Sequence, residues 1–201
     1  MSPRAYSMER RAEQVAVTRD AIIDAATALY RERGIRATSM QEVARRADVA
    51  PGTALNHFRP PETLTRAVLD RIARSLEVPT GTIFRGARSR PERIRRLVAA
   101  LFDFYDRSSA WFEVFRGEFG TVPILQEGER QFWGAIQGLW SSALSPLPQS
   151  GLAWAAVMGL TSPATLGALR GAGLSVAQAS EVIGDLAADA VDRYVRRRSI
   201  R

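Results

Sequence analysis

Apolar residues recur at helical spacing along most of the chain, in segments separated by turn residues. The first segment runs from Thr18 to Arg33 and ends at Gly34, a residue type favoured just beyond a helix C-terminus. Further helices are expected from about Pro61 to Leu76, from Pro91 onward, and over 111–115, 123–144, 151–160 and 175–197. Ser162 and Pro163 suit an N-cap and a first helical position, so a helix break is expected there. The absence of an alternating strand pattern predicts an all-α fold.

Two short helical patterns joined by a tight turn lie between Ala37 and Leu64. Ser39 and Glu42, three residues apart, have the spacing of a capping box. One buried face of the first helix is formed by Met40, Val43, Ala44 and Ala47. Asp48 tolerates the left-handed conformation that the turn requires, and the second pattern starts after Ala50. Two short helices joined by a turn of about 3–4 residues form a helix-turn-helix, whose second helix enters the DNA major groove.

The region from Thr18 to Val68 resembles the DNA-binding domain of the TetR family of transcriptional regulators. The resemblance rests on LYRERG at the end of the first helix, on ATSMQEVARRADV, and on the GT, HF and E-x-L that follow. It implies a homodimeric repressor with an N-terminal three-helix helix-turn-helix domain and a helical-bundle ligand-binding and dimerisation domain. We therefore expect the DNA-binding domain with its connecting helix at 18–76 and the second domain at 77–201. Residues 1–17, polar and basic, are expected to form a flexible arm.

Short polar and small residues on the second helix are candidates for contacts with base edges or phosphates. With the positions that the resemblance adds, the DNA-binding candidates are Thr38, Ser39, Pro51, Gly52, Thr53, Leu55, Asn56, His57 and Arg59. Leu55 replaces a Tyr usual in the family, Asn56 replaces an aromatic or His, and Pro61 replaces a phosphate-binding Lys. Losing that cation should weaken sequence-independent binding and lower the salt slope by about one unit. Arg59 or Arg66 could replace it, and an ordinary helical hairpin with a polar face remains the alternative.

Composition and charge exclude several other classes. The chain has 201 residues, a net charge of +7 and no cysteine, which excludes disulfides and cysteine metal sites. Every basic residue other than the single histidine is arginine. The absence of cysteine fits a reducing cytoplasm, where we expect the protein to be located. No signal-peptide core and no run of about 20 apolar residues is present, so no membrane association is expected.

An enzymatic function is not expected, although a small helical enzyme is the alternative from another class. The single histidine, His57, lies on the proposed recognition helix, where a catalytic triad would have to be built. A site with two histidine ligands cannot form, and no glycine-rich phosphate loop is present. We therefore expect neither a metal nor a cofactor.

Most of the large aromatic side chains lie between residues 97 and 160. Aromatic residues at helical spacing usually form a core, but ligand pockets are also apolar and lined by aromatics. The TetR resemblance implies an effector pocket here, with Phe104, Tyr105, Trp111, Phe115, Trp133 and Trp140 as candidate lining residues. The expected effector is a small apolar or aromatic molecule. The nearby charged residues Asp103, Arg107, Glu113, Arg116 and Glu118 are expected on a solvated face.

Small residues in 151–160 and in the last helix would allow close helix approach. The family implies that the last two long helices pair with their copies in a homodimer, whereas simple packing within one chain is the alternative. The sequence thus predicts a regulator of transcription that binds double-stranded operator DNA, most simply a repressor released by its effector. A DNA-binding protein without an effector is the alternative, and the sequence does not distinguish repression from activation.

Overall fold

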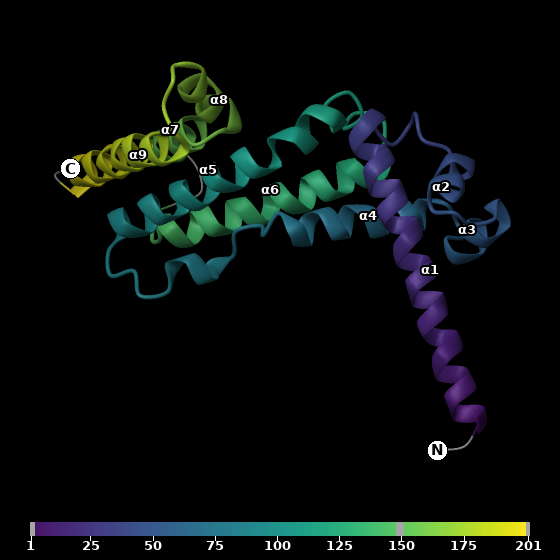
Figure 1. The fold of residues 1–201 in the computed structure, drawn as a ribbon. Helices are drawn as coiled ribbons and strands as arrows, with labels where there is room; N and C mark the ends of the chain where they lie inside the picture. Colours follow the sequence, from purple (N-terminus) through teal and green to yellow (C-terminus); the bar gives the residue numbers. More distant parts are fainter. Residues whose placement is uncertain (1–2, 148–150, 200–201) are drawn as a thin grey trace. The chain divides into compact units, whose positions relative to one another are not determined.

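The computed structural model describes residues 3–147 and 151–199, and these ranges fold into helices without a strand, which confirms the all-α prediction (Figure 1). The first two helices are α1 (Pro3–Arg33) and the short α2 (Met40–Arg46). Seven more helices and one short 3-10 helix follow within the described ranges. They are α3 (Pro51–His57), α4 (Glu62–Ser75), η1 (Gly81–Phe84), α5 (Arg90–Phe115), α6 (Pro123–Leu144), α7 (Leu152–Leu160), α8 (Pro163–Gly171) and α9 (Val176–Ser199).

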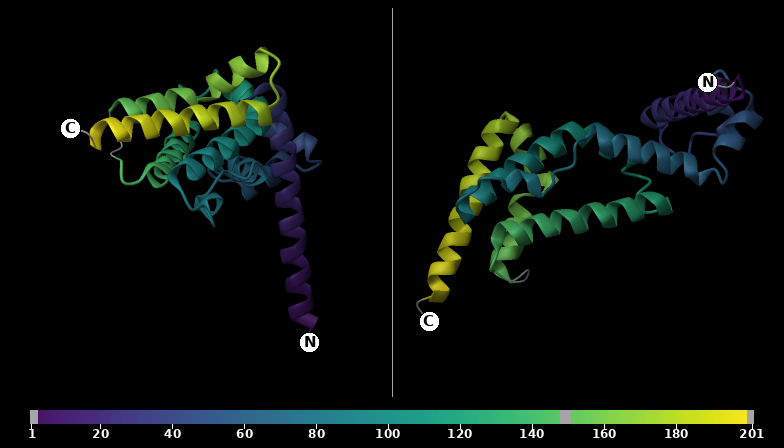
Figure 2. Two further views of the ribbon diagram at one scale, coloured as in Figure 1. Left: turned by 90° about the vertical axis from the view of Figure 1, so that its left-hand side faces the viewer. Right: turned by 90° about the horizontal axis from the view of Figure 1, so that it is seen from below.

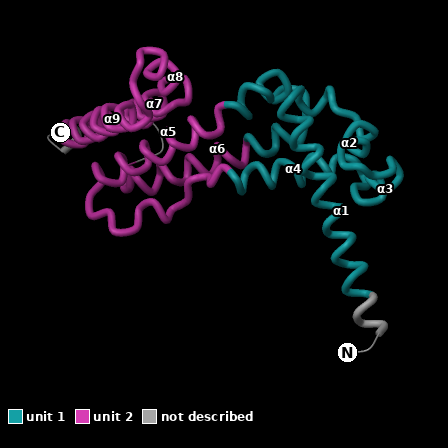
Figure 3. The backbone as a smooth tube through the Cα atoms, viewed as in Figure 1, with its two compact units in different colours: residues 1–75, 110–129 teal, residues 76–109, 130–201 magenta. Residues whose placement is uncertain are grey.

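The chain divides into two compact units (Figure 3). Unit 1 consists of residues 1–75 and 110–129, and unit 2 consists of residues 76–109 and 130–201. The expected second domain at 77–201 therefore does not form a single compact unit, because residues 110–129 group with the N-terminal helices. Helices α5 and α6 each contribute residues to both units.

The first helix begins much earlier than the sequence pattern predicts. Figure 2 shows α1 as one continuous helix, and its 31 residues include most of the expected arm at 1–17. Residues 3–17, expected as a flexible arm, are helical, whereas residues 1 and 2 lie outside the described ranges. This stretch contains no glycine after Pro3 and is rich in Ala, Arg, Glu and Gln, which favour helix by intrinsic propensity. Met8 is 72% exposed, so local propensity rather than burial explains this part of the helix.

Helix α5 is also longer than predicted. The segment Trp111–Phe115, expected as a separate short helix, is the last part of α5. The helix continues through Ser108 and Ser109, whose hydroxyls donate to the carbonyls of Phe104 (2.6 Å) and Asp106 (2.8 Å). Helix α5 ends shortly before Gly117.

The predicted break before Pro163 is confirmed. The Ser162 hydroxyl accepts a hydrogen bond from the Thr165 amide at 3.2 Å, and Pro163 occupies the first position of α8. At the start of α9, the Ser175 amide donates to the Gln178 side chain at 2.9 Å, and the Gln178 amide donates to the Ser175 hydroxyl at 3.2 Å. These caps fix the N-terminal ends of α8 and α9.

Each unit has its own apolar core. The core of unit 1 includes Ile22, Ala26, Leu29, Val43, Ala44, Ala54, Phe58, Leu64 and Val68. The core of unit 2 includes Ile94, Leu97, Leu101, Phe102, Ile136, Trp140, Leu144, Val157, Ala179 and Val191. Within the described ranges, no single helix is long and apolar enough to cross a membrane, and only the bent pair α7 and α8 reaches that length and composition together.

Candidate nucleic-acid interface

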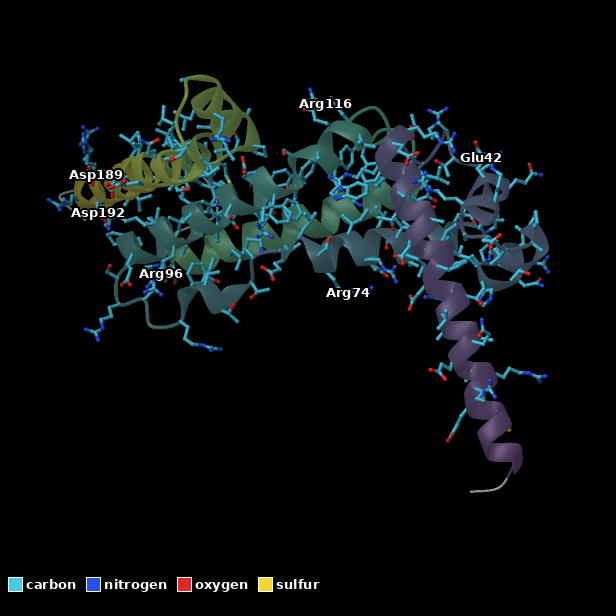
Figure 4. The ribbon with its side chains drawn as sticks, in the orientation of Figure 1. Glu42, Arg74, Arg96, Arg116, Asp189 and Asp192 are labelled. Carbon is cyan, nitrogen blue, oxygen red and sulfur yellow. The ribbon has the colours of Figure 1, made fainter. Side chains whose placement is uncertain are left out.

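A capping box fixes the start of α2, the first helix of the proposed DNA reader. The Ser39 hydroxyl accepts a hydrogen bond from the Glu42 amide at 3.3 Å, and the Glu42 carboxylate accepts one from the Ser39 amide at 3.0 Å. Glu42 is labelled in Figure 4. The hydrogen bond from the Ser39 amide, more than any other contact, lowers the pKa of Glu42. The predicted capping box is thus confirmed, and it orders the two ends of the first turn of α2.

The turn between α2 and α3 has the predicted left-handed residue. Asp48 has a φ of 54°, a conformation that Asp tolerates better than most residues with a side chain. The Val49 amide donates to the Ala44 carbonyl at 3.0 Å and closes the turn over the end of α2. The turn therefore sets the direction in which α3 leaves α2.

Small and aromatic side chains anchor the two short helices to the rest of unit 1. Val43 and Ala44 of α2 and Ala54 of α3 are buried, and Phe58 directly after α3 is 1% exposed. The Arg19 guanidinium lies 4.9 Å from the centroid of the Phe58 ring. Seven-residue helices are too short to be stable alone, so this burial is what holds α3 in place.

Helix α4 is joined to α1 by polar contacts. Arg71 donates to Asp20 at 2.6 Å and to Asp24, both on α1. The Tyr30 hydroxyl lies 3.0 Å from the Thr65 hydroxyl, and burial raises the pKa of Tyr30. These contacts, with the apolar core, join α4 to α1, and α1 in turn packs against both α2 and α3.

The outer face of α3 is open to solvent. Pro51, Gly52 and Asn56 are exposed, and Leu55 is 37% exposed. No atom beyond the local backbone lies within 4 Å of the place where a Gly52 Cβ would stand. The buried Ala54 lies on the opposite side, so α3 presents a small-residue and amide surface outward. A surface of this kind can approach DNA closely and hydrogen-bond to base edges or phosphates.

The remaining residues predicted to contact DNA differ in their exposure and in whether they already form hydrogen bonds within the protein. Thr53 and His57 are half-buried, and Arg59 is exposed. The Thr38 hydroxyl donates to the Gly34 carbonyl at 2.8 Å, and the Ser39 hydroxyl is used in the capping box. Thr38 and Ser39 therefore have a structural role in this chain in addition to the DNA contact predicted for them.

The two arginines proposed to replace the missing lysine at Pro61 differ in their surroundings. Arg66 is paired with Glu127 at 3.1 Å, so its charge is partly neutralised. Arg59 makes no hydrogen bond or ion pair with any described residue and lies two positions before Pro61. Arg59 is therefore the better candidate for the phosphate contact.

The six aromatic residues predicted to line an effector pocket are divided between the two units. Trp111 and Phe115 stack in unit 1, with ring centroids 5.5 Å apart. The other four belong to unit 2: Phe104, Tyr105 and Trp140 are buried, and Trp133 is 37% exposed. Burial raises the pKa of Tyr105 to about 12, so its hydroxyl is neutral at physiological pH.

Unit 2 also carries an apolar groove between α7 and α9, with a volume of about 490 Å³. Its lining residues are Leu152, Ala153, Ala156, Leu160, Leu186, Asp189, Ala190, Arg193, Tyr194 and Arg197. Leu152 and Leu186 are exposed, and the charged residues come only from α9, where Asp189 is labelled in Figure 4. Within the described ranges, no three metal-ligating side chains come together.

Sequence reasoning missed the role of Glu118. It was expected on a solvated face, but its carboxylate accepts hydrogen bonds from the backbone amides of Ile35 and Arg36 in the junction between α1 and α2. These partners lie more than 80 residues earlier in the chain. No local pattern in the sequence could have indicated the contact.

The capped α2, the left-handed turn and the open face of α3 define a helix-turn-helix domain. Residues 22–68 match the family described as bacterial regulatory proteins of the tetR family. This match places the DNA-binding domain of the TetR family at residues 22–68 of the chain.

Three proteins similar in sequence to this chain are bacterial regulators of transcription. The chain is 30% identical over 106 residues to the HTH-type transcriptional activator FasR of Mycolicibacterium smegmatis, covering 52% of this chain and 48% of FasR. It is 40% identical over 91 residues to an HTH-type transcriptional repressor of Mycobacterium tuberculosis, covering 42% of this chain and 47% of that protein. It is 27% identical over 135 residues to the repressor KstR2 of the same species, covering 63% of this chain and 68% of KstR2. The chain thus spans about half the length of FasR and of the first repressor.

A solved structure supports the fold over most of the chain. A transcriptional regulator from Rhodococcus sp. Rha1 superposes with a TM-score of 0.59, over 86% of this chain and 95% of that protein, at 22% sequence identity. At this identity the likeness concerns the fold alone.

Proposed function

We propose that this protein is a transcriptional regulator that reads a DNA operator through the open face of α3 and acts in the cytoplasm. The observation that carries the proposal is the exposed small-residue and amide surface of α3, held by a capped α2 and a buried Phe58. Repression is the proposed direction, because the named relatives from Mycobacterium tuberculosis are repressors. FasR is named an activator, so activation is the second possibility.

Asn56 is the residue on α3 best suited to read a base. It is the only asparagine in the chain, it is exposed, and a carboxamide can donate and accept at once, as bidentate recognition of adenine requires. Replacing Asn56 with alanine should cost about 1–3 kcal/mol at particular base pairs and leave other positions of the operator unaffected. The measurement is the affinity of wild-type and variant protein for a panel of single-base operator variants.

Arg59→Ala provides the matched comparison. A phosphate contact should weaken binding evenly across all operator variants and lower the salt slope by about one unit. An even loss for Asn56→Ala as well would show that Asn56 contacts phosphate and that base reading lies elsewhere on α3.

A homodimer is proposed to form through α7 and α9, the helices that line the groove in unit 2. In support, the groove combines apolar residues from both helices with exposed Leu152 and Leu186 on its surface. A second copy of the chain presents the same surface, so a two-fold axis would bury both copies of the apolar patch together. Such a dimer should place its recognition helices about 34–36 Å apart, or at a multiple of that spacing, to meet successive major grooves.

A small, largely apolar effector is proposed to bind among the aromatic residues of unit 2. In support, Phe104 stacks with Phe132 at 5.1 Å and Trp133 is partly exposed beside Phe132, so aromatic surface there is accessible from outside. Trp111 and Phe115, which the family resemblance also suggested, belong to unit 1 and are left out of this proposed site. The chain passes between unit 1 and unit 2 after α4 ends at Ser75, within α5 and within α6, so motion in unit 2 has three helical routes to the DNA reader.

The effector proposal is tested by tryptophan fluorescence. Non-fluorescent apolar alcohols such as decanol and adamantanol should change the emission of the wild-type protein, and the change should be smaller in Trp133→Phe. Linkage requires that a ligand which weakens operator binding also binds more weakly to the DNA complex, by the same factor. The coupling free energy that corresponds to this factor is typically about 1–3 kcal/mol. Equal ligand affinity with and without saturating operator would instead support a DNA-binding protein without effector control by these ligands.

A further inference from the structure

The connection between α5 and α6 reaches back to the junction between α1 and α2. Glu118 lies in this connection, and each of its two carboxylate oxygens accepts one backbone hydrogen bond. The Ile35 amide donates to Oε2 at 2.9 Å, and the Arg36 amide donates to Oε1 at 2.8 Å. Both amides lie after the end of α1 at Arg33 and before the N-cap Ser39, where no helix supplies an acceptor.

The junction is shaped to receive this carboxylate. Gly34 has a φ of +85°, and a Cβ at this position would stand 2.7 Å from Oε1 of Glu118. A side chain at position 34 would therefore be strained and would also displace Glu118. The Thr38 hydroxyl donates to the Gly34 carbonyl at 2.8 Å, within the same bend. The bend through which the chain passes from α1 into α2 is thus held at both of its ends.

Two further contacts join residues 110–129 to the end of α1 and to the α1–α2 junction. The Arg36 guanidinium donates to the Thr121 hydroxyl at 3.4 Å, and the Arg31 guanidinium lies 5.9 Å from the centroid of the Trp111 ring. These contacts agree with the grouping of residues 110–129 in unit 1. The proposed DNA-reading unit is therefore built from two stretches of sequence, and Glu118 joins them through two hydrogen bonds to the backbone.

We propose that Glu118 is a positioning residue for DNA reading, which fixes the α1–α2 junction and thereby the direction in which α2 and α3 leave α1. The inference rests on the proposed DNA-binding function. A carboxylate is suited to this role because its two oxygens accept from two amides at once and its negative charge strengthens both hydrogen bonds. Glu118 touches no DNA base in this account and acts through the backbone of the junction.

The test compares Glu118→Gln with Glu113→Gln in the full-length chain. Glutamine has the shape of glutamate but only one acceptor oxygen, so one of the two junction amides loses its partner. We expect amide hydrogen exchange at Ile35 or Arg36 to become about tenfold faster or more, because bonds to charged groups contribute at least that factor. Glu113 is exposed and pairs with Arg116 just beyond the end of α5, so Glu113→Gln should change neither amide.

DNA binding gives the readout that separates positioning from simple stability. At a temperature well below unfolding, Glu118→Gln should lose about tenfold in affinity for the selected operator and much less for random duplex, because a misdirected α3 loses base contacts more than phosphate contacts. Glu118→Asp keeps the charge and should recover part of this loss. Unchanged amide exchange, or equal losses on operator and random DNA, would overturn the inference. Failure of the wild-type protein to prefer any duplex would overturn the proposed function, while amide exchange would still report whether Glu118 holds the junction.

Discussion

Replacing Phe58 with alanine is expected to lower the free energy of unfolding of the DNA-reading unit by about 3–5 kcal/mol, the usual cost of truncating a buried aromatic side chain. Phe58 follows α3 directly and is 1% exposed, so alanine would leave a cavity beneath the recognition helix. The substitution would also remove the ring beneath the Arg19 guanidinium. Urea unfolding followed by far-ultraviolet circular dichroism measures the loss.

Leu55→Ala is the matched control for Phe58→Ala. Leu55 lies three residues earlier on the outer face of α3 and is 37% exposed, so its truncation should cost less than about 1 kcal/mol. Equal effects of the two substitutions would contradict the packing described for α3, because they would mean that Phe58 does not anchor it.

A second large effect is expected from Leu186→Arg on α9. Leu186 lines the groove between α7 and α9 and is 51% exposed in the single chain. Two-fold symmetry would place position 186 of both chains in the proposed dimer interface. Burying one leucine side chain contributes about 1.5–3 kcal/mol. Loss of two leucines and introduction of two like charges should therefore weaken the dimer by about 3–6 kcal/mol, or two to four orders of magnitude in dissociation constant. Sedimentation equilibrium at micromolar concentration measures it.

Val17→Arg is the matched control for the dimer. Val17 has a similar exposure, 57%, but lies on α1 in unit 1. This variant should remain dimeric. A wild-type chain that sediments as a monomer with and without DNA, or a Leu186→Arg variant that stays dimeric, would contradict the proposed interface.

Sequence predicted the features of the DNA reader that depend on nearby residues. The capping box joins Ser39 and Glu42 over three positions, and the left-handed turn depends on the conformational tolerance of Asp48 itself. Hydrophobic spacing likewise located the buried face of α2, because that face packs on α1 within the same short region. Such features are encoded within one or two helical turns and so can be seen in the pattern.

Two kinds of feature were not predicted from the sequence. One depends on small differences in local helix preference, and the other depends on partners distant in the sequence. The helix over residues 3–17 has little apolar periodicity to indicate it, since its stability comes from intrinsic propensity. The continuity of α5 through Ser108 was not predicted because serine is found both inside helices and at their ends, and its hydroxyl here bonds back to its own helix. The two bonds of Glu118 join segments that only the fold brings together.

The most direct measurement of the central claim is the affinity of the purified full-length protein for a duplex selected from random DNA, compared with a scrambled duplex at physiological salt. We expect a selected site with two inverted half-sites about one helical turn apart, and an affinity at least about a thousandfold higher than for the scrambled duplex. We also expect Asn56→Ala to remove most of the preference at one base pair of each half-site. Selection that enriches no common sequence, with equal affinity for both duplexes, would contradict the claim that α3 reads an operator.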